Sequence, residues 1–325
     1  MKVPVPGRHW LSLLFSLLLF PNAGLALPPQ PAPTTFRDDA EFLELLQRTA
    51  FDYFWNEANP TNGLIRDRST PASKCSIAAV GFGLTAIGIG IDHGWIDRAA
   101  GRERVRRTLR TFLESPQGDE PDGRIGTRGW YYHFLEMDTA QRAWKCELSS
   151  IDTALFLAGA LDASEFFSGN APEEREIREN VARLVRRIDW QWMLNRGSTF
   201  SMGWHPERGF IHRRWTGYNE GMILYLLALG APGSPIGRRA WTAWTEDYQW
   251  ETHYGRTFLV FAPLFGHQYS HCWVDFRGKR DAWMRSHGSD YFENSRQATL
   301  AQRSYAIENP LGDQSYGPSM WGFPA

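Results

Sequence analysis

Apolar residues recur with a helical period along most of the chain, and strand-like alternation is rare. Segment 39–58, for example, places apolar residues at positions i, i+3, i+4 and i+7 and begins with acidic residues that suit a helix dipole. Two kinds of helical segment alternate. Those that are apolar on nearly every face belong inside a larger structure, whereas amphipathic ones belong on its rim.

Nine such segments follow one another, at 39–58, 74–94, 97–115, 147–167, 172–195, 216–230, 235–250, 257–275 and 289–309. A four-helix bundle has no reason to make every second helix uniformly apolar. An α-solenoid stays open as an alternative, although no repeat of about 34 or 40 residues, as such folds have, is visible. Two concentric rings of helices explain the order better. The pattern therefore predicts an all-α fold, an (α/α)6 toroid that is truncated after about nine helices, because closing such a ring takes six helical hairpins.

The first 26 residues have the pattern of a signal peptide. Lys2 and Arg8 precede the apolar stretch WLSLLFSLLLF (10–20), and GLA (24–26) has the small-x-small form of a cleavage site. The apolar stretch is shorter than the roughly 20 residues that a membrane-spanning helix needs. We expect export to the periplasm or the medium and no membrane association after cleavage. The expected organisation is a signal peptide at 1–26, an extended Pro-rich lead at 27–37 and one helical domain at 38–325.

The amino-acid composition limits the classes of ligand that the chain is expected to bind. The net charge is −1, so nothing in the balance favours nucleic acid or an anionic membrane surface. Many of the 15 Trp and 11 Tyr lie in polar, Gly-rich loops, where a flat ring with a polar group can contact a ligand. Cys75, Cys146 and Cys272 match no zinc-site spacing. A Cys75–Cys146 disulfide is open to an exported protein, but buried free thiols are the simpler expectation.

Acidic residues gather at the beginnings of the apolar segments. In a toroid the inner helices point the same way, so their N-terminal turns meet at one central mouth. Glu147 and Asp152 stand at the start of one inner segment and Glu220 at the start of the next, while Asp138 belongs to an aromatic stretch (129–149) that can form a small hairpin over the mouth. Acidic first turns also occur in ordinary helix capping, so a structural role for Glu220 stays open. The candidate substrate-binding residues around the mouth are Arg66, Asp67, Trp130, Tyr131, His133, Trp204, Trp215, Asn219, Glu251, Tyr254, His267, Gln268 and Tyr269.

Carboxyl groups inside an aromatic-walled cleft suit the hydrolysis of a neutral polysaccharide or oligosaccharide by a monomeric enzyme. One carboxylic acid protonates the departing glycosidic oxygen, and a second carboxylate activates water or attacks the anomeric carbon. Two alternatives remain. The stretch GHQYSHCW (266–273) offers His267, Tyr269 and His271, and such a Tyr/His pair can abstract a proton beside a uronate carboxyl, as in a polysaccharide lyase. A glycan-binding remnant without catalysis is the other.

Six motifs in chain order carry a resemblance to a known family: GLIRDRS, RGWYYHFLEMDT, ELSSIDTALFLAGAL, GYNEGMILYLLALG, WETHYG and FGHQYSHCWVDFRG. Together they resemble the bacterial glucoamylase-like family that contains endo-β-1,2-glucanases and is related to domains of cyclic β-1,2-glucan synthases. The resemblance runs from about residue 38 to the C-terminus. It implies a six-hairpin α/α toroid, export, inverting hydrolysis of linear β-1,2-glucan to short oligosaccharides, and no metal or organic cofactor.

The resemblance also assigns roles. Glu220 in YNEGM is similar to the proton donor, and Asp138, Glu147 and Asp152 match acidic positions of the catalytic cleft. Family members continue beyond the loop that matches QSYGPSMWGFPA (314–325). We therefore expect the C-terminal part of the ring to be missing, with this chain a fragment or a pseudo-enzyme.

Overall fold

The computed structural model describes residues 35–322, which fall into two units divided between Leu43 and Glu44. The described part of the first unit opens helix α1 (Asp39–Asn56), where Glu41 accepts hydrogen bonds from the backbone and side chain of Arg37. All other elements belong to the second unit, which is described by itself below. The predicted signal peptide and most of the Pro-rich lead lie outside the described residues. Within residues 35–322, no helix has the length and apolar character needed to cross a membrane.

Helices dominate the second unit and differ in burial. Three of them, α2 (Ile77–Asp92), α4 (Ser150–Phe166) and α7 (Met222–Leu229), are apolar and largely buried. Two others, α3 (Arg98–Glu114) and α5 (Pro172–Arg187), bury one face and expose a charged one. The remaining helices are α6 (Trp190–Leu194), α8 (Arg238–Thr245), α9 (Phe265–Gln268), the 3-10 helix η1 (Tyr269–Cys272), α10 (Ala282–Ser286) and α11 (Tyr291–Glu308). The predicted alternation of rim and interior helices is confirmed from α2 to α7.

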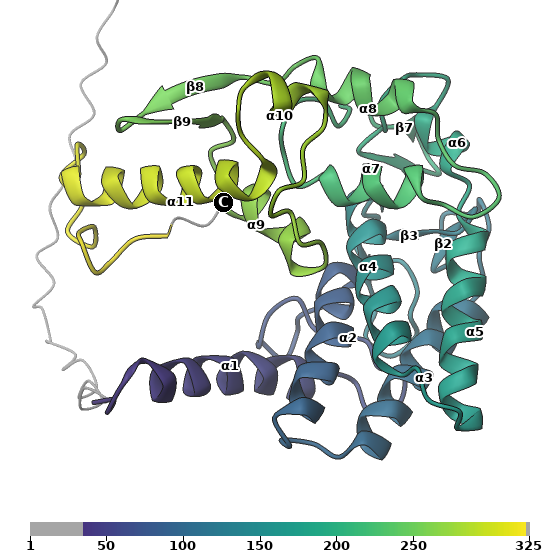
Figure 1. The fold of residues 1–325 in the computed structure, drawn as a ribbon. Helices are drawn as coiled ribbons and strands as arrows, with labels where there is room; N and C mark the ends of the chain where they lie inside the picture. Colours follow the sequence, from purple (N-terminus) through teal and green to yellow (C-terminus); the bar gives the residue numbers. More distant parts are fainter. Residues whose placement is uncertain (1–34, 323–325) are drawn as a thin grey trace, which may run out of the picture. The chain divides into compact units, whose positions relative to one another are not determined.

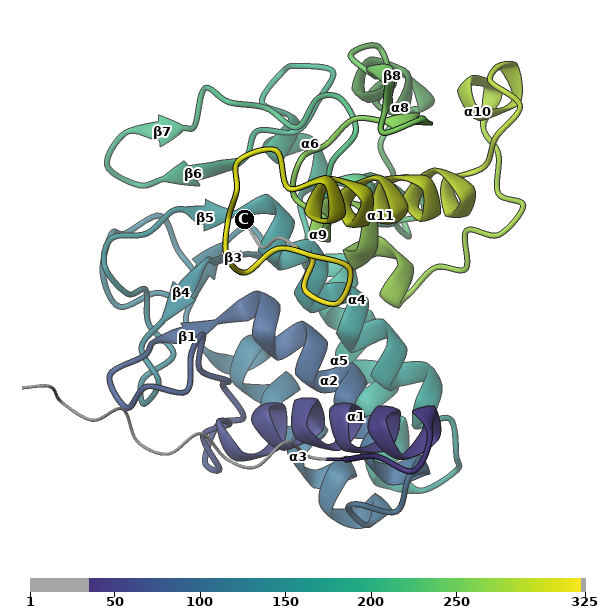
Figure 2. The same ribbon diagram turned by 90° about the vertical axis from the view of Figure 1, so that its left-hand side faces the viewer.

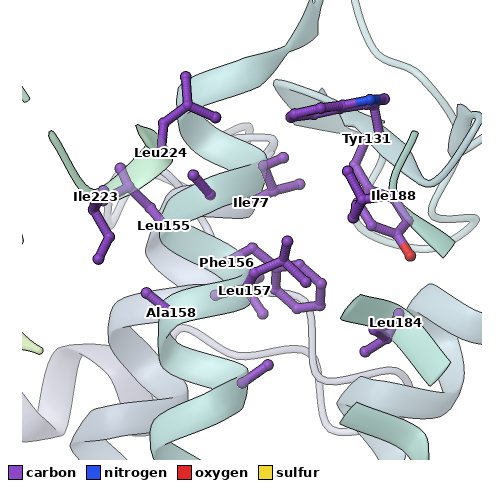
Figure 3. Close-up of a cluster of buried hydrophobic side chains, with 14 of the residues drawn as sticks. Ile77, Tyr131, Leu155, Phe156, Leu157, Ala158, Leu184, Ile188, Ile223 and Leu224 are labelled. Atoms are coloured by element: carbon purple, nitrogen blue, oxygen red, sulfur yellow. The ribbon is translucent and has the colours of Figure 1, made fainter. Parts of the chain in front are cut away.

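The buried helices share one core. Helix α4 lies beside α2, α5 and α7, and α3 lies beside α5 (Figures 1 and 2). Figure 3 shows Ile77 of α2, Phe156 of α4 and Leu184 of α5 in one apolar cluster. All three are fully buried, and burying a side chain of this size stabilises the fold by about 1.5–3 kcal/mol.

Helices α2 and α4 approach each other backbone to backbone. A Cβ atom at Gly159 would lie 1.9 Å from the carbonyl oxygen of Gly81, and one at Gly81 would lie 2.3 Å from the carbonyl oxygen of Leu155. Both distances are far inside van der Waals contact. Only glycine at these two positions permits the observed separation of the helices.

Short strands precede the buried helices. Strands β1 (Cys75–Ser76) and β4 (Phe134–Leu135) pair with each other, and a five-stranded antiparallel sheet has the order β2 (Gly126–Thr127), β3 (Trp130–Tyr132), β5 (Leu148–Ser149), β6 (Gly203–His205), β7 (Gly209–Phe210). Figure 2 shows β1, β3, β4 and β5 beside the N-terminal ends of α2 and α4. The hairpin expected within 129–149 is confirmed, since Tyr132 pairs with Leu148 in an antiparallel register.

The predicted helix at 257–275 is wrong. Strand β9 (Arg256–Leu259) pairs instead with β8 (Trp250–His253), and α9 and η1 follow it. Thr257 and Phe258 favour strands, and Pro263 lacks the N–H that a continuous helix would need. The two-residue turn between the strands has positive φ at both positions, 53° at Tyr254 and 70° at Gly255, the conformation of a type I′ hairpin.

Three other helical segments differ in extent. The segment 172–195 divides into α5 and α6, α7 begins only at Met222, and α8 ends at Thr245 because the chain turns into β8. The sequence pattern did not predict helix α10. The three cysteines are free thiols, as expected, although only Cys75 is buried and Cys272 is exposed.

We predict that Gly159→Ala lowers the free energy of unfolding by about 1–3 kcal/mol, because the new methyl group forces α2 and α4 apart. Denaturant unfolding monitored by far-UV circular dichroism measures the change. Gly317→Ala is the control: its Cβ would meet none of the described atoms within 4 Å, and its φ lies outside the left-handed region. That variant should stay within about 0.5 kcal/mol of the unmodified protein. Equal effects of the two substitutions would contradict the close approach.

Candidate active site

The start of helix α4 fixes the first acidic side chain. Ser149 is the N-cap residue of α4, and its Oγ accepts a hydrogen bond from the Asp152 backbone N–H (3.2 Å). The same hydroxyl donates to Oδ2 of Asp152 at 2.5 Å. This reciprocal Ser-x-x-Asp arrangement resembles a capping box and holds the carboxyl group over the N-terminus of the helix. Helix α2 begins similarly, with Ser76 as its N-cap.

His133 lies between two carboxyl groups. Its Nδ1 is 2.8 Å from Oε1 of Glu147, which precedes β5, and its Nε2 is 3.6 Å from Oδ2 of Asp152. The His133 backbone N–H also donates to the Glu147 carbonyl oxygen at 3.0 Å. The imidazole stacks on the ring of Phe134, with 3.9 Å between ring centroids. The ring is thus held on three sides, and each nitrogen faces an acidic oxygen.

The charges of these three groups depend on one another. Burial alone would lower the pKa of His133, but the negative charges of Asp152 and Glu147 outweigh it and raise that pKa. Burial opposes the ionisation of Glu147, yet the hydrogen bond and charge of His133 lower its pKa. At Asp152 burial is the larger effect and raises the pKa, against the opposing influence of His133 and Ser149. A protonated imidazole therefore favours the ionised form of both carboxylates.

Glu220 lies immediately before helix α7 and does not cap it. The N-cap residue of α7 is Gly221, and no described side chain makes a capping hydrogen bond there. The Gly221 N–H donates instead to Oδ1 of Asn219 at 2.9 Å. The Oε2 atom of Glu220 is buried and has no hydrogen-bond partner among the described residues. Burial raises the pKa of Glu220, and the negative charge of Asp152 raises it further.

Two further side chains, Tyr269 and Asp67, interact electrostatically with these acidic groups and His133. Tyr269 of η1 packs edge-on against Phe82 of α2, and burial together with the charges of Glu220 and Asp152 raises its pKa. Asp67 acts through its negative charge on His133. We call this set the acidic cluster. Its members are Asp67, His133, Glu147, Asp152, Glu220 and Tyr269, all of which the sequence predicted as site residues.

Three predicted substrate-binding residues are core residues, which corrects their assignment. Trp130 and Tyr131 are fully buried in β3, where the Trp130 indole N–H donates to the Asp189 carbonyl oxygen and the Tyr131 hydroxyl to that of Phe112. His267 is 1% exposed, and burial lowers its pKa to about 4. The aromatic alternation in 129–149 came from a strand that is covered on both faces.

Other predicted residues are near the surface or serve the backbone. Arg66 pairs with Glu57 at 3.4 Å, and the buried Asn219 amide donates to the carbonyl oxygens of Thr216 and Gly217. Trp215 is nearly buried, and its indole N–H donates to Ser150. Trp204 is half-buried and packs on Trp192, and Gln268 is exposed.

Two acidic residues lie elsewhere. Asp138 is exposed and lines a polar hollow of about 460 Å³ with Asn62 and Arg107. Glu251 pairs with His253 at 3.0 Å on the hairpin whose turn contains Tyr254. No hydrogen bond or ion pair among the described residues joins Asp138 or Glu251 to the acidic cluster. Their catalytic and binding roles stay predictions.

Sequence reasoning missed two supports of the cluster. Ser149 was visible as the first residue of a Ser-x-x-Asp pattern before an apolar helix, which is a capping signal. Phe134 had no distinguishing signal, because its role depends on stacking with the neighbouring His133. Within residues 35–322, no group of three or more His, Cys, Asp or Glu side chains is arranged to hold a metal ion.

Known proteins share this fold. Residues 212–325 match the family model Glycoamylase, described as "Putative glucoamylase". A "putative glucoamylase" structure from Bacteroides uniformis superimposes with a TM-score of 0.80 at 27% identity, over 89% of this chain and 71% of that one. The crystal structure of a β-1,2-glucanase from Parabacteroides distasonis gives a TM-score of 0.79 at 25% identity, over 90% of this chain and 45% of that one. The α/α-toroid fold class and the resemblance to the glucoamylase-like family are therefore confirmed.

One relative with a named activity is similar over most of this chain. The chain is 28% identical over 322 residues to the exo β-1,2-glucooligosaccharide sophorohydrolase (non-reducing end) of Parabacteroides distasonis, with 88% of this chain covered. It spans 43% of that relative's length. The chain is similar to these proteins. Their substrates support a proposal about the function of this chain.

We predict that nuclear magnetic resonance titration of His133 gives a pKa above 6.5, the ordinary histidine value. In Glu147→Gln the His133 pKa should fall, because one acidic partner is gone while burial still disfavours the cation. Glu165→Gln, at the opposite end of α4 from Asp152, should leave the His133 pKa unchanged. A His133 pKa that is the same in all three proteins would contradict the paired geometry.

His133 and Glu147 together determine the pH range in which their interaction stabilises the fold. The raised pKa of His133 stabilises the fold fully below pH 6.5, and this contribution is lost as the pH rises through the folded-state pKa. The lowered pKa of Glu147 stabilises the fold above its ordinary value of 4.5 and is lost as the pH falls through the folded-state pKa. The stability difference between the unmodified protein and His133→Gln, measured by denaturant unfolding across this range, should therefore be largest between pH 4.5 and 6.5.

Proposed function

We propose that this chain is a glycoside hydrolase of β-1,2-glucan, cleaving the polymer internally with inversion at the anomeric carbon. The observation that carries the proposal is Glu220, whose buried Oε2 has no partner among the described residues and whose ionisation both burial and Asp152 oppose. A carboxyl group whose pKa is raised holds its proton more readily than an exposed one, and a proton held there can be given to a glycosidic oxygen. The similarity to β-1,2-glucan-degrading proteins supports the substrate class.

The chemistry divides between protonated and ionised groups. Glu220 donates its proton to the glycosidic oxygen as the bond from that oxygen to the anomeric carbon breaks. A water molecule attacks the opposite face of the anomeric carbon and passes a proton to a carboxylate. Glu147, whose pKa His133 lowers, is the first candidate for that carboxylate; Asp152 is the second, since burial raises its pKa while His133 and Ser149 oppose that rise.

A lyase mechanism is less well supported. It would use Tyr269 as a base beside a uronate carboxyl, but the charges of Glu220 and Asp152 raise the pKa of Tyr269 and so disfavour the tyrosinate. The carboxylate of Glu147, whose pKa is lowered, would also repel an acidic polymer. His267, which the sequence offered as a partner for Tyr269, is buried in the core.

We predict that Glu220→Gln abolishes the release of reducing ends from linear β-1,2-glucan and leaves the melting temperature nearly unchanged. The amide cannot donate an acidic proton, whereas no capping bond is lost among the described residues. Glu165→Gln serves as the control and should retain full activity. A Glu220→Gln protein that stays active would exclude Glu220 as the acid. Strong loss of stability would indicate a structural role, and substrate binding without products in the unmodified chain would indicate a glycan-binding remnant.

We also propose export, which rests on the charged start, the apolar stretch 10–20 and the small residues that flank Leu25. Expression of the full sequence in a Gram-negative host should give a periplasmic product whose first residue is Leu27, determined by mass spectrometry. Ala26→Arg should block cleavage, because the site requires a small residue at this position. Recovery of unprocessed protein from the cytoplasm would contradict the proposal.

A further inference from the structure

Trp144 is an exposed tryptophan beside the acidic cluster. It lies in the loop between β4 and β5, and 65% of its surface is accessible. Its ring contacts Phe134 at 5.3 Å between centroids, and Phe134 stacks on His133. The exposed indole is thus two ring contacts away from His133, which pairs with Glu147.

The backbone around Trp144 is in an unusual conformation. Trp144 and Lys145 have φ of 52° and 53°, in the left-handed region that residues with a Cβ rarely adopt. Two successive residues of this kind persist only where the surrounding structure holds them, and such positions concentrate at functional sites.

A buried arginine holds this loop in place. The Arg142 side chain is 2% exposed, and its guanidinium donates to the carbonyl oxygens of Lys145 and Cys146, both at 2.7 Å. The same group pairs with Glu207 of the β6–β7 turn at 2.7 Å and lies over the ring of Tyr132. The loop is therefore anchored directly after Trp144, while the indole itself stays in solvent.

We propose that Trp144 is a sugar-stacking platform, a binding subsite for a glucosyl unit next to the one whose bond is cleaved. A preorganised flat ring suits the C–H face of a pyranose and loses little conformational freedom on binding. The inference rests on the proposed function for its ligand, a β-linked neutral glucan. Trp144 acts in substrate binding and contributes nothing to proton transfer.

The test uses the full chain and linear β-1,2-linked glucopentaose. Trp144→Ala should raise KM about tenfold and leave kcat within about twofold, because stacking is lost in the ground and transition states alike. The KM of Trp144→Phe should lie between those of Trp144→Ala and the unmodified protein. Phe292→Ala, which removes an exposed aromatic ring from α11, should leave KM unchanged.

Trp144→Gly separates binding from folding. Glycine adopts positive φ without strain, so this variant should melt at the same temperature or higher while its KM rises as in Trp144→Ala. A merely structural indole would give a lower melting temperature and an unchanged KM, which would overturn the proposal.

Failure of the hydrolase proposal is distinguishable from failure of the subsite. If the unmodified chain binds the pentasaccharide by fluorescence titration without cleaving it, and Trp144→Ala binds about tenfold more weakly, the subsite stands and the hydrolase activity does not. If the chain cleaves the sugar and Trp144→Ala has an unchanged KM, the subsite is excluded. If the unmodified chain does not bind the sugar at all, both are excluded.

Discussion

The backbone contact between α2 and α4 at Gly81 and Gly159 fixes the geometry on which the acidic cluster depends. Because glycine has no side chain to separate the two helices there, the strands that lead into them, β1 and β5, are held near each other. Strand β4 pairs with β1, and β3 pairs with β5. His133 is the single residue between β3 and β4, so both buried helices determine its position.

The second constraint is electrostatic. A carboxylate buried in protein needs a partner, because the loss of hydration is costly and interactions between charges are stronger away from water. His133 meets this need for Glu147 and, at a longer distance, for Asp152. Burial and, after it, the negative charge of Asp152 raise the pKa of Glu220. The pKa of Glu220 therefore depends on Asp152, which faces the histidine held between β3 and β4.

Sequence periodicity predicted the helices that have regular patterns. It failed where side-chain burial or a reversal of the chain determines the secondary structure. The segments that became α2, α3 and α4 were predicted correctly, α3 from its amphipathic period and α2 and α4 from long apolar runs rich in Gly and Ala. The segment 257–275 begins with the apolar run FLVFAPLF (258–265), and an apolar run is compatible with a strand or a helix. Pro263 and the Tyr254–Gly255 turn decided for β9 and two short helices. The acidic residues of the cluster were found because they precede apolar helices. Trp130 was misassigned because exposure cannot be read from a strand whose covering faces come from distant segments.

Glu220 and Asp152 both lie at the start of a buried helix, yet their surroundings differ in a way that bears on chemistry. Asp152 lies within the first turn of α4, accepts a hydrogen bond from Ser149 and faces the imidazole of His133, and these contacts offset part of the effect of burial, which raises its pKa. Glu220 precedes the N-cap of α7, and Asn219 takes the backbone N–H that a capping carboxylate would otherwise accept. Glycoside hydrolysis needs one carboxyl group that holds a proton and another that does not. Glu147, whose pKa the imidazole of His133 lowers, and Glu220, whose pKa burial raises, differ in this way, so the asymmetry supports a hydrolase over a glycan-binding mouth that is only acidic.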